Sequence, residues 1–187
     1  MAIRTEATIE DLYNAPRDNG TYELVNGELV HMSPTGFMPG RVSFQICIAL
    51  MHYEEQTGSG CAVPDNVAFL VDLPHRKSFS PDASYTFHPP DNAMRFIEGA
   101  PIFAAVVRSE YDYSPAADRA YAAKRRDYFA AGTLVVWDVD PVHKTIASYR
   151  ADQPGSPTRF GIGDTADAEP ALPSWRVAMN AIFRATP

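Results

Sequence analysis

Three residues of this chain, Asp82, Lys124 and Arg108, have types and positions that could support acid–base or metal chemistry. Asp82 follows Ser80-Pro81 at the start of a short predicted strand, and carboxylate oxygens are the hard ligands that magnesium prefers. A lysine can stabilise developing negative charge, or help to orient and deprotonate a water. An aspartate after a proline also fits an ordinary turn, so Asp82 alone does not identify a site.

Lys124 is the most informative of these residues, because it falls on the inward stripe of a predicted helix. That helix begins at Ser114-Pro115, with the serine as N-cap and the proline in the first turn, and stops at Gly132. At 3.6 residues per turn, the stripe contains Ala117, Ala120, Tyr121, Tyr128 and Ala131. A lysine among them needs a route to solvent or a carboxylate partner. The sides of the helix and its solvent face are expected to carry Arg119, Arg125 and Arg126.

The predicted strand over residues 102–108 (IFAAVVR) is apolar on both faces, which is typical of the centre of a sheet. Because side chains alternate along a strand, one face carries Ile102, Ala104, Val106 and Arg108. An arginine at the end of that face also fits a solvent-exposed strand end.

Glu23 lies in a predicted hairpin, TYELVNGELVHM, whose turn is Asn26-Gly27. Asn-Gly is a strong hairpin signal because both turn positions need a positive φ. A two-residue loop pairs Val25 with Glu28, Leu24 with Leu29 and Glu23 with Val30. Glu23 therefore opposes an apolar residue.

The other segments complete a single α/β domain over residues 1–187. Helices are predicted over 8–12 and 41–56, and strands over 67–71, 83–87, 134–140 and 143–150. The core covers about residues 20–150. Residues 151–187 form a C-terminal extension that packs on it, with one short strand before residue 173 and a terminal helix over 175–184.

Composition limits the class of protein. Hydrophobic residues make up 45% of the 187 and charged residues 21%, which excludes a disordered tail, a coiled coil and a collagen-like chain. The net charge of −7, from 16 Lys and Arg against 23 Asp and Glu, argues against a general DNA-coating protein. It does not exclude a nuclease, because local carboxylates can hold a metal beside a small basic patch.

Several other functions lack their sequence signals. Cys47 and Cys61 give neither a disulfide framework nor zinc-ligand spacing. The sequence contains no phosphate-binding glycine motif, so no nucleotide cofactor is expected. It also contains no apolar run of 18 residues and no signal core, which predicts a cytoplasmic protein without a membrane partner.

The segments YELVNGEL, SPDASY and IFAAVVRSEYDYSPAADRAYAAKRRDYFAAGTLVVWDVDP resemble the Uma-two family of endonucleases, within the PD-(D/E)XK restriction-endonuclease-like superfamily. The resemblance covers about residues 22–141 and is most specific over 103–141. It implies a restriction-endonuclease-like mixed sheet flanked by helices, with an N-terminal hairpin. It also implies a divalent metal (magnesium or manganese) at one sheet edge, cleavage of phosphodiester bonds in DNA, and a homodimer.

The resemblance also assigns roles to particular residues. Asp82 corresponds to the metal-binding aspartate, Lys124 to the catalytic lysine and Glu23 to an auxiliary acidic residue. Val106 stands where the family has its second metal-binding carboxylate, and valine has no oxygen to offer. Glu110 is four residues further on, about 13 Å along a strand. Arg108 stands where ordinary superfamily members have their lysine.

Three hypotheses follow. The first is a metal-dependent endonuclease that is weakened or inactive because magnesium binding has lost an anionic ligand. The second is a non-catalytic descendant that binds nucleic acid or another protein. The third is a structural domain in which Lys124 only pairs with Asp82, since a fold analogy does not establish a function.

Overall fold

The computed structural model describes residues 6–16 and 20–184, and this part of the chain is built around a six-stranded mixed sheet. The strand order is β11-β10-β9-β8-β6-β3. These strands are β3 (Cys61–Pro64), β6 (Ala83–Thr86), β8 (Phe103–Val107), β9 (Val135–Asp140), β10 (Thr145–Arg150) and β11 (Gln153–Phe160). Among the described strands of this sheet, only β8 and β9 pair in parallel, and the helix α3 (Pro115–Ala130) connects them, as a parallel pair requires.

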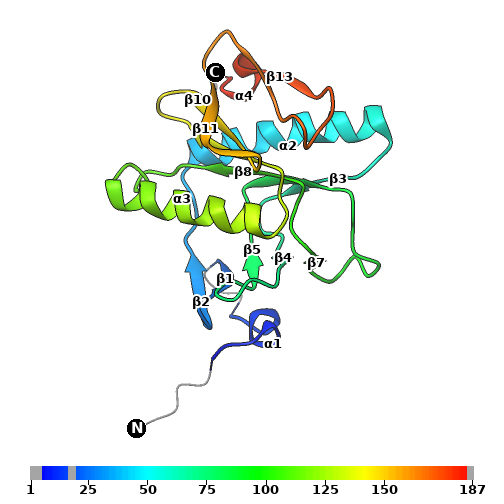
Figure 1. The fold of residues 1–187 in the computed structure, drawn as a ribbon, viewed down its shortest axis with the longest axis vertical. Coiled ribbons are helices and arrows are strands. Elements are labelled where there is room, and N and C mark those ends of the chain that lie inside the picture. Colours follow the sequence, from blue (N-terminus) through cyan, green and yellow to red (C-terminus); the bar gives the residue numbers. More distant parts are fainter. Residues whose placement is uncertain (1–5, 17–19, 185–187) are drawn as a thin grey trace.

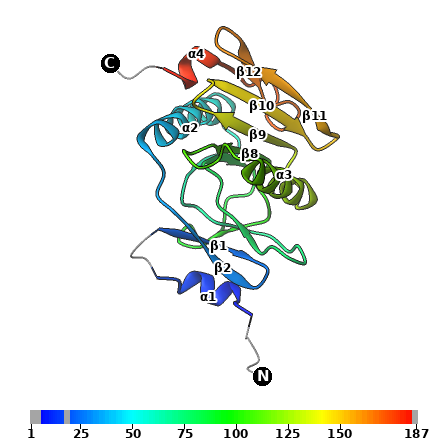
Figure 2. The same ribbon diagram turned by 90° about the vertical axis from the view of Figure 1, so that its left-hand side faces the viewer.

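Helices cover both faces of the sheet (Figures 1 and 2). The helix α2 (Phe37–Thr57) lies on one face, where its buried residues join a core with Phe103, Ala105 and Trp137. The opposite face carries α3, whose Tyr128 is buried with Ala104 and Val136. The odd-numbered residues of β8 face the core under α2, and the even-numbered ones face the core under α3. The prediction that this strand is apolar on both faces is therefore confirmed.

The N-terminal hairpin has the predicted register. It consists of β1 (Thr21–Val25) and β2 (Glu28–Met32), with Glu23 opposite Val30. Asn26 and Gly27 have φ values of 52° and 69°, as the tight turn requires. The short helix α1 (Ile9–Tyr13), capped by Thr8, packs beside the hairpin at the end of the molecule away from α4 (Figure 2).

A small sheet of short strands lies between the hairpin and the main sheet (Figure 1). Its order is β5-β4-β7, with β4 (Phe69–Leu70), β5 (Ser78–Phe79) and β7 (Ile97–Glu98). The strand predicted over 67–71 is therefore only two residues long. The strands β3, β5 and β7 were not predicted, because two to four residues are too few to display a period.

The two long helices follow their capping signals. Ser114 caps α3, accepting from the Ala117 N–H, and Gly58 ends α2 in the left-handed region. The helix α2 begins four residues before the predicted start, and Pro39 lies in its first turn. A proline is tolerated there because the N–H groups of a first turn have no partner within the helix.

The C-terminal segment is part of the main sheet and its core. β11 is the edge strand beside β10, and a second pair is formed by β12 (Thr165–Asp167) and β13 (Arg176–Ala178). The predicted terminal helix over 175–184 is wrong for its first half, and α4 spans only Met179–Ile182. Trp175, Val177 and Met179 are buried while the residues between them are exposed, a period of two that favours a strand.

No helix in the described ranges is both long and apolar enough to cross a membrane.

Candidate active site

Asp82, Val106 and Asp138 form a row across three neighbouring strands. Ala83 of β6 pairs with Ala105 of β8, and the Asp82 N–H donates to the Ala105 carbonyl at 3.1 Å, which brings Asp82 opposite Val106. Val106 in turn pairs with Asp138 of β9. Directly opposed residues share a face of the sheet, with Cβ atoms about 5 Å apart. A valine thus separates two carboxylates.

Glu23 reaches this region from the hairpin and is almost fully buried, with 3% exposed. Its Oε1 accepts from Lys124 Nζ at 2.7 Å and from the Ser80 N–H at 2.9 Å, while its Oε2 accepts from Arg76 Nη1 at 2.7 Å. Burial alone would raise the pKa of Glu23, but these three donors hold it below its usual range. Glu23 is therefore a carboxylate with both oxygens engaged.

Lys124 has the carboxylate partner that its position on α3 called for. The partner is Glu23 rather than Asp82, so the pairing assumed in the structural-domain hypothesis is wrong. The lysine side chain is 19% exposed, which leaves it a limited route to solvent. The predicted stripe is otherwise only partly correct, since Ala120 is exposed whereas Arg125 stacks 3.5 Å over the Tyr149 ring of β10.

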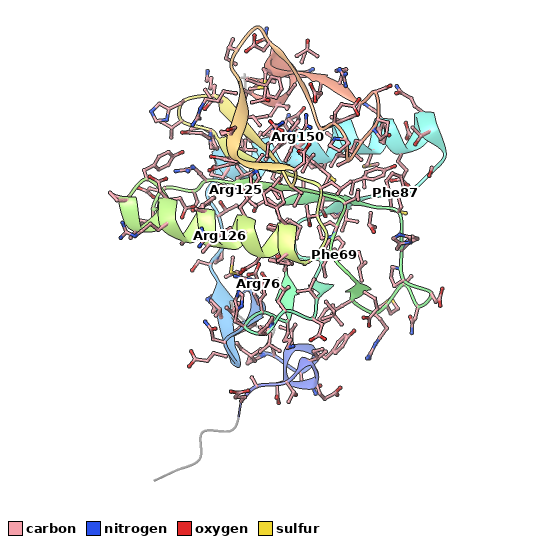
Figure 3. All side chains as sticks on the ribbon, viewed as in Figure 1. Phe69, Arg76, Phe87, Arg125, Arg126 and Arg150 are labelled. Carbon is pink, nitrogen blue, oxygen red and sulfur yellow. The ribbon has the colours of Figure 1, made fainter. Side chains whose placement is uncertain are left out.

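Arg76 and Asp127 extend this ion pair into a network, and neither residue was among the predicted site residues. Arg76 Nε donates to Asp127 Oδ2 at 2.9 Å, and Asp127 Oδ1 lies 2.8 Å from His75 Nε2. Figure 3 labels Arg76 between α3 and the N-terminal hairpin. Asp127 is three residues after Lys124 on α3, so helical spacing signals that the two are neighbours. Nothing in the loop around Arg76 signals its role.

Asp82 has different surroundings. Burial raises its pKa to about 7, and the nearby Asp65 and Glu23 also raise it, whereas the Val107 N–H and Lys124 act in the opposite direction. The Val107 N–H donates to Asp82 Oδ2 at 2.7 Å. Asp65 and Asp82 both line a hollow of about 330 Å³ beside the start of β6. Asp65, which follows β3, was not among the predicted site residues.

Arg108, at the position where ordinary superfamily members have their lysine, is paired with two acidic side chains. It makes a bidentate pair with Asp138, with N–O distances of 2.7 and 2.8 Å, and a further bond to Asp118 at 2.8 Å. Those hydrogen bonds raise its pKa even further above neutrality. The prediction that Arg108 lies at an exposed strand end is therefore wrong, because its side chain is largely buried within this network. Glu110 is exposed in the following turn and lines a different pocket from Asp82.

The residues as they stand do not fit the two-carboxylate metal centre that the resemblance implies. Within residues 6–16 and 20–184, no group of three or more His, Cys, Asp or Glu side chains could hold a metal ion. Val106 offers no ligand beside Asp82, and both Glu23 oxygens already accept hydrogen bonds. Magnesium and manganese binding therefore stays a prediction that this donor set does not favour.

The mixed sheet, the helices on its two faces and the hairpin that brings an acid to its edge define a nuclease-like α/β protein. A family model described as Uma2, putative restriction endonuclease, matches residues 9–180, and the chain belongs to that family. The family resemblance and the predicted fold class are thus confirmed.

Among solved structures, the chain is similar to a putative nuclease belonging to DUF820 from Anabaena variabilis ATCC 29413. The TM-score is 0.74 at 16% sequence identity, and the likeness covers 94% of this chain and 97% of that one. At this identity the comparison shows a shared fold. No match was found among curated proteins.

Proposed function

We propose that this chain is a nuclease-family protein that meets DNA at the Asp82 edge of its sheet and whose hydrolytic activity is weakened or absent. The observation that carries the proposal is Val106. One step beyond the Ala83–Ala105 pair, it faces Asp82, where a second carboxylate would complete the PD-(D/E)XK pair. A metal held by one carboxylate has lost much of the charge that binds it.

The residues around Val106 are consistent with a nuclease site that lacks its second carboxylate. Lys124 is close enough to Asp82 for its charge to act on that carboxyl, lowering its pKa. Its ammonium is also paired with Glu23, so it could orient a phosphate only with part of its charge already compensated. Asp82, Lys124 and Glu23 thus keep an arrangement suited to phosphate chemistry without the second metal ligand.

The test is restoration of the acid. We expect the native chain to cleave supercoiled plasmid or labelled DNA hardly at all with magnesium or manganese, and Val106→Glu to raise cleavage at least tenfold. Glutamine has nearly the size of glutamate but no charge, so Val106→Gln should stay inactive. Asp82→Ala should abolish the gain in the Val106→Glu background. Circular dichroism melting checks that each variant is folded.

Two results would reject the proposal. Robust cleavage by the native chain that disappears in Asp82→Ala would mean that one carboxylate suffices. A folded Val106→Glu variant that remains inactive would favour the alternative, a non-catalytic nucleic-acid- or protein-binding descendant. A homodimer and a cytoplasmic location stay predictions.

A further inference from the structure

Three basic side chains from separate segments meet at one pocket of about 310 Å³. Arg41 comes from α2, Lys144 from the turn between β9 and β10, and Arg184 from the residues after α4. Apolar groups, among them Val42 and Phe183, line the rest of the pocket, and no acidic residue lines it.

Within residues 6–16 and 20–184, no acidic side chain pairs with these three cations. Within the described ranges, none of the three forms an ion pair or donates a side-chain hydrogen bond, and Arg41 stacks 5.7 Å from the centre of the Phe44 ring. By contrast, Arg76 and Arg108 are each paired with two carboxylates. In a chain of net charge −7, an uncompensated cluster of this kind suits an anionic ligand.

The basic pocket continues toward Asp82. It shares Phe37, Met38 and Pro141 with a second pocket of about 410 Å³. That second pocket shares Pro34 with the hollow that Asp82 lines. The three hollows are thus neighbours on the surface, and together they are called the track, from the cations to the candidate site.

Aromatic side chains stand along the middle of this track. Phe37 is 74% exposed and Tyr111 is 84% exposed, and both line the second pocket. Large aromatic groups left this open offer faces on which unpaired bases can stack. The one acidic side chain lining that pocket is Glu110.

We propose that this track binds a single strand of nucleic acid, with phosphates at Arg41, Lys144 and Arg184 and bases stacked on Phe37 and Tyr111. Cations at one end and aromatic faces along the groove are the two components of single-strand binding surfaces. A duplex keeps its bases stacked on one another and would use only the cations. The proposal rests on the proposed function, because the strand would lead to Asp82.

The first test measures binding of a fluorescein-labelled 12-mer of deoxythymidine by anisotropy, in EDTA so that cleavage plays no part. The triple variant Arg41→Ala, Lys144→Ala, Arg184→Ala should weaken binding at least tenfold. It should also reduce the slope of log K against log salt by about 2, since each phosphate contact contributes about 0.7. The matched control is Arg119→Ala, Arg126→Ala, Arg159→Ala, which removes three exposed arginines elsewhere and should leave the slope unchanged.

The second test concerns stacking. Phe37→Ala and Tyr111→Ala should each weaken binding of the 12-mer about five- to a hundredfold, whereas Met94→Ala, which removes a 90% exposed side chain elsewhere, should not. A duplex of equal length should bind more weakly than the single strand and be insensitive to both aromatic variants.

Equal loss in the two triple variants, duplex binding as tight as single-strand binding, or no binding would overturn the proposal. These outcomes are separable from failure of the proposed function. If Val106→Glu gains cleavage while the pocket variants bind normally, single-strand binding along the track is rejected and the proposed function is supported. If the pocket variants lose binding while Val106→Glu stays inactive, single-strand binding along the track is supported and the proposed function is rejected.

Discussion

Asp82 and Glu23 are two carboxyl groups of one site whose surroundings act in opposite directions on their pKa values. Glu23 has Lys124 and Arg76 as partners, and they outweigh its burial and lower its pKa. Asp82 has one backbone donor and two acidic neighbours, and burial raises its pKa to about 7. The site therefore contains one carboxylate that stays charged, Glu23, and one carboxyl group that is easily protonated, Asp82.

This difference predicts how stability depends on pH. Between pH 4 and pH 7 the folded chain keeps a proton on Asp82 that the unfolded chain has released, so Asp82 makes stability fall as pH rises, by at most about 1.4 kcal/mol per pH unit. Asparagine at this position does not titrate, and its amide oxygen can still accept a hydrogen bond from the Val107 N–H. We expect the urea-unfolding free energy of Asp82→Asn, relative to the native chain, to increase from pH 5 to pH 8.

The matched control is Asp72→Asn, on the surface. Lys77 holds the pKa of Asp72 below its usual value, so Asp72 stays ionised from pH 5 to pH 8. Its stability difference from the native chain should not change over that range. Parallel curves for Asp82→Asn and the native chain would contradict the raised pKa of Asp82.

Which site residues could be predicted depends on how local their signals are. Lys124 was identifiable because a charge on the apolar stripe of a helix needs a partner, and the structure provides Glu23. Val106 was identifiable only through the family resemblance, because a valine on a central strand is unremarkable by itself. Arg76 could not be predicted, because its partners are 51 and 53 residues away along the chain and no pattern links them.

At the level of elements, the network around Arg76 ties three segments together. Glu23 comes from β1, Lys124 and Asp127 come from α3, and Arg76 comes from the loop before β5. The hairpin and α3 were predictable separately, from Asn26-Gly27 and from Ser114-Pro115. Their contact depends on buried charges, which no local pattern specifies.

Removing Arg76 should therefore cost much more stability than removing the lysine beside it. Arg76→Ala leaves the buried Glu23 and the partly buried Asp127 with one partner fewer, and we expect a loss of about 3–5 kcal/mol in unfolding free energy. Lys77→Ala removes an ion pair with Asp72, whose side chain is 97% exposed, and should cost under about 1 kcal/mol. Urea denaturation of both variants measures the difference. Equal losses would mean that the network does not connect the hairpin to α3.

For the whole molecule, the C-terminal segment completes the core of the main sheet rather than only covering it. Trp175 stacks on Trp137 of β9 at 5.2 Å between ring centroids and contacts Phe103 of β8 at 5.6 Å. Its Nε1 donates to the Ala49 carbonyl of α2 at 3.2 Å. The segment's glycines, prolines and polar residues indicate a loop-rich extension. Sequence alone does not reveal that its alternating apolar residues fill the face beside α2.

Trp175→Ala should consequently lower the stability of the entire chain, by about 3–5 kcal/mol, because it removes a buried aromatic side chain from the centre of the core. Ile162→Ala, in the same segment but 55% exposed, should change stability by less than about 0.5 kcal/mol. Urea unfolding followed by both fluorescence and circular dichroism measures these differences. One shared transition that moves to lower urea means that the segment and the sheet unfold together. A separate early transition in Trp175→Ala, with the main one unmoved, would instead mean that residues after 151 fold as an independent layer on a core that is complete without them.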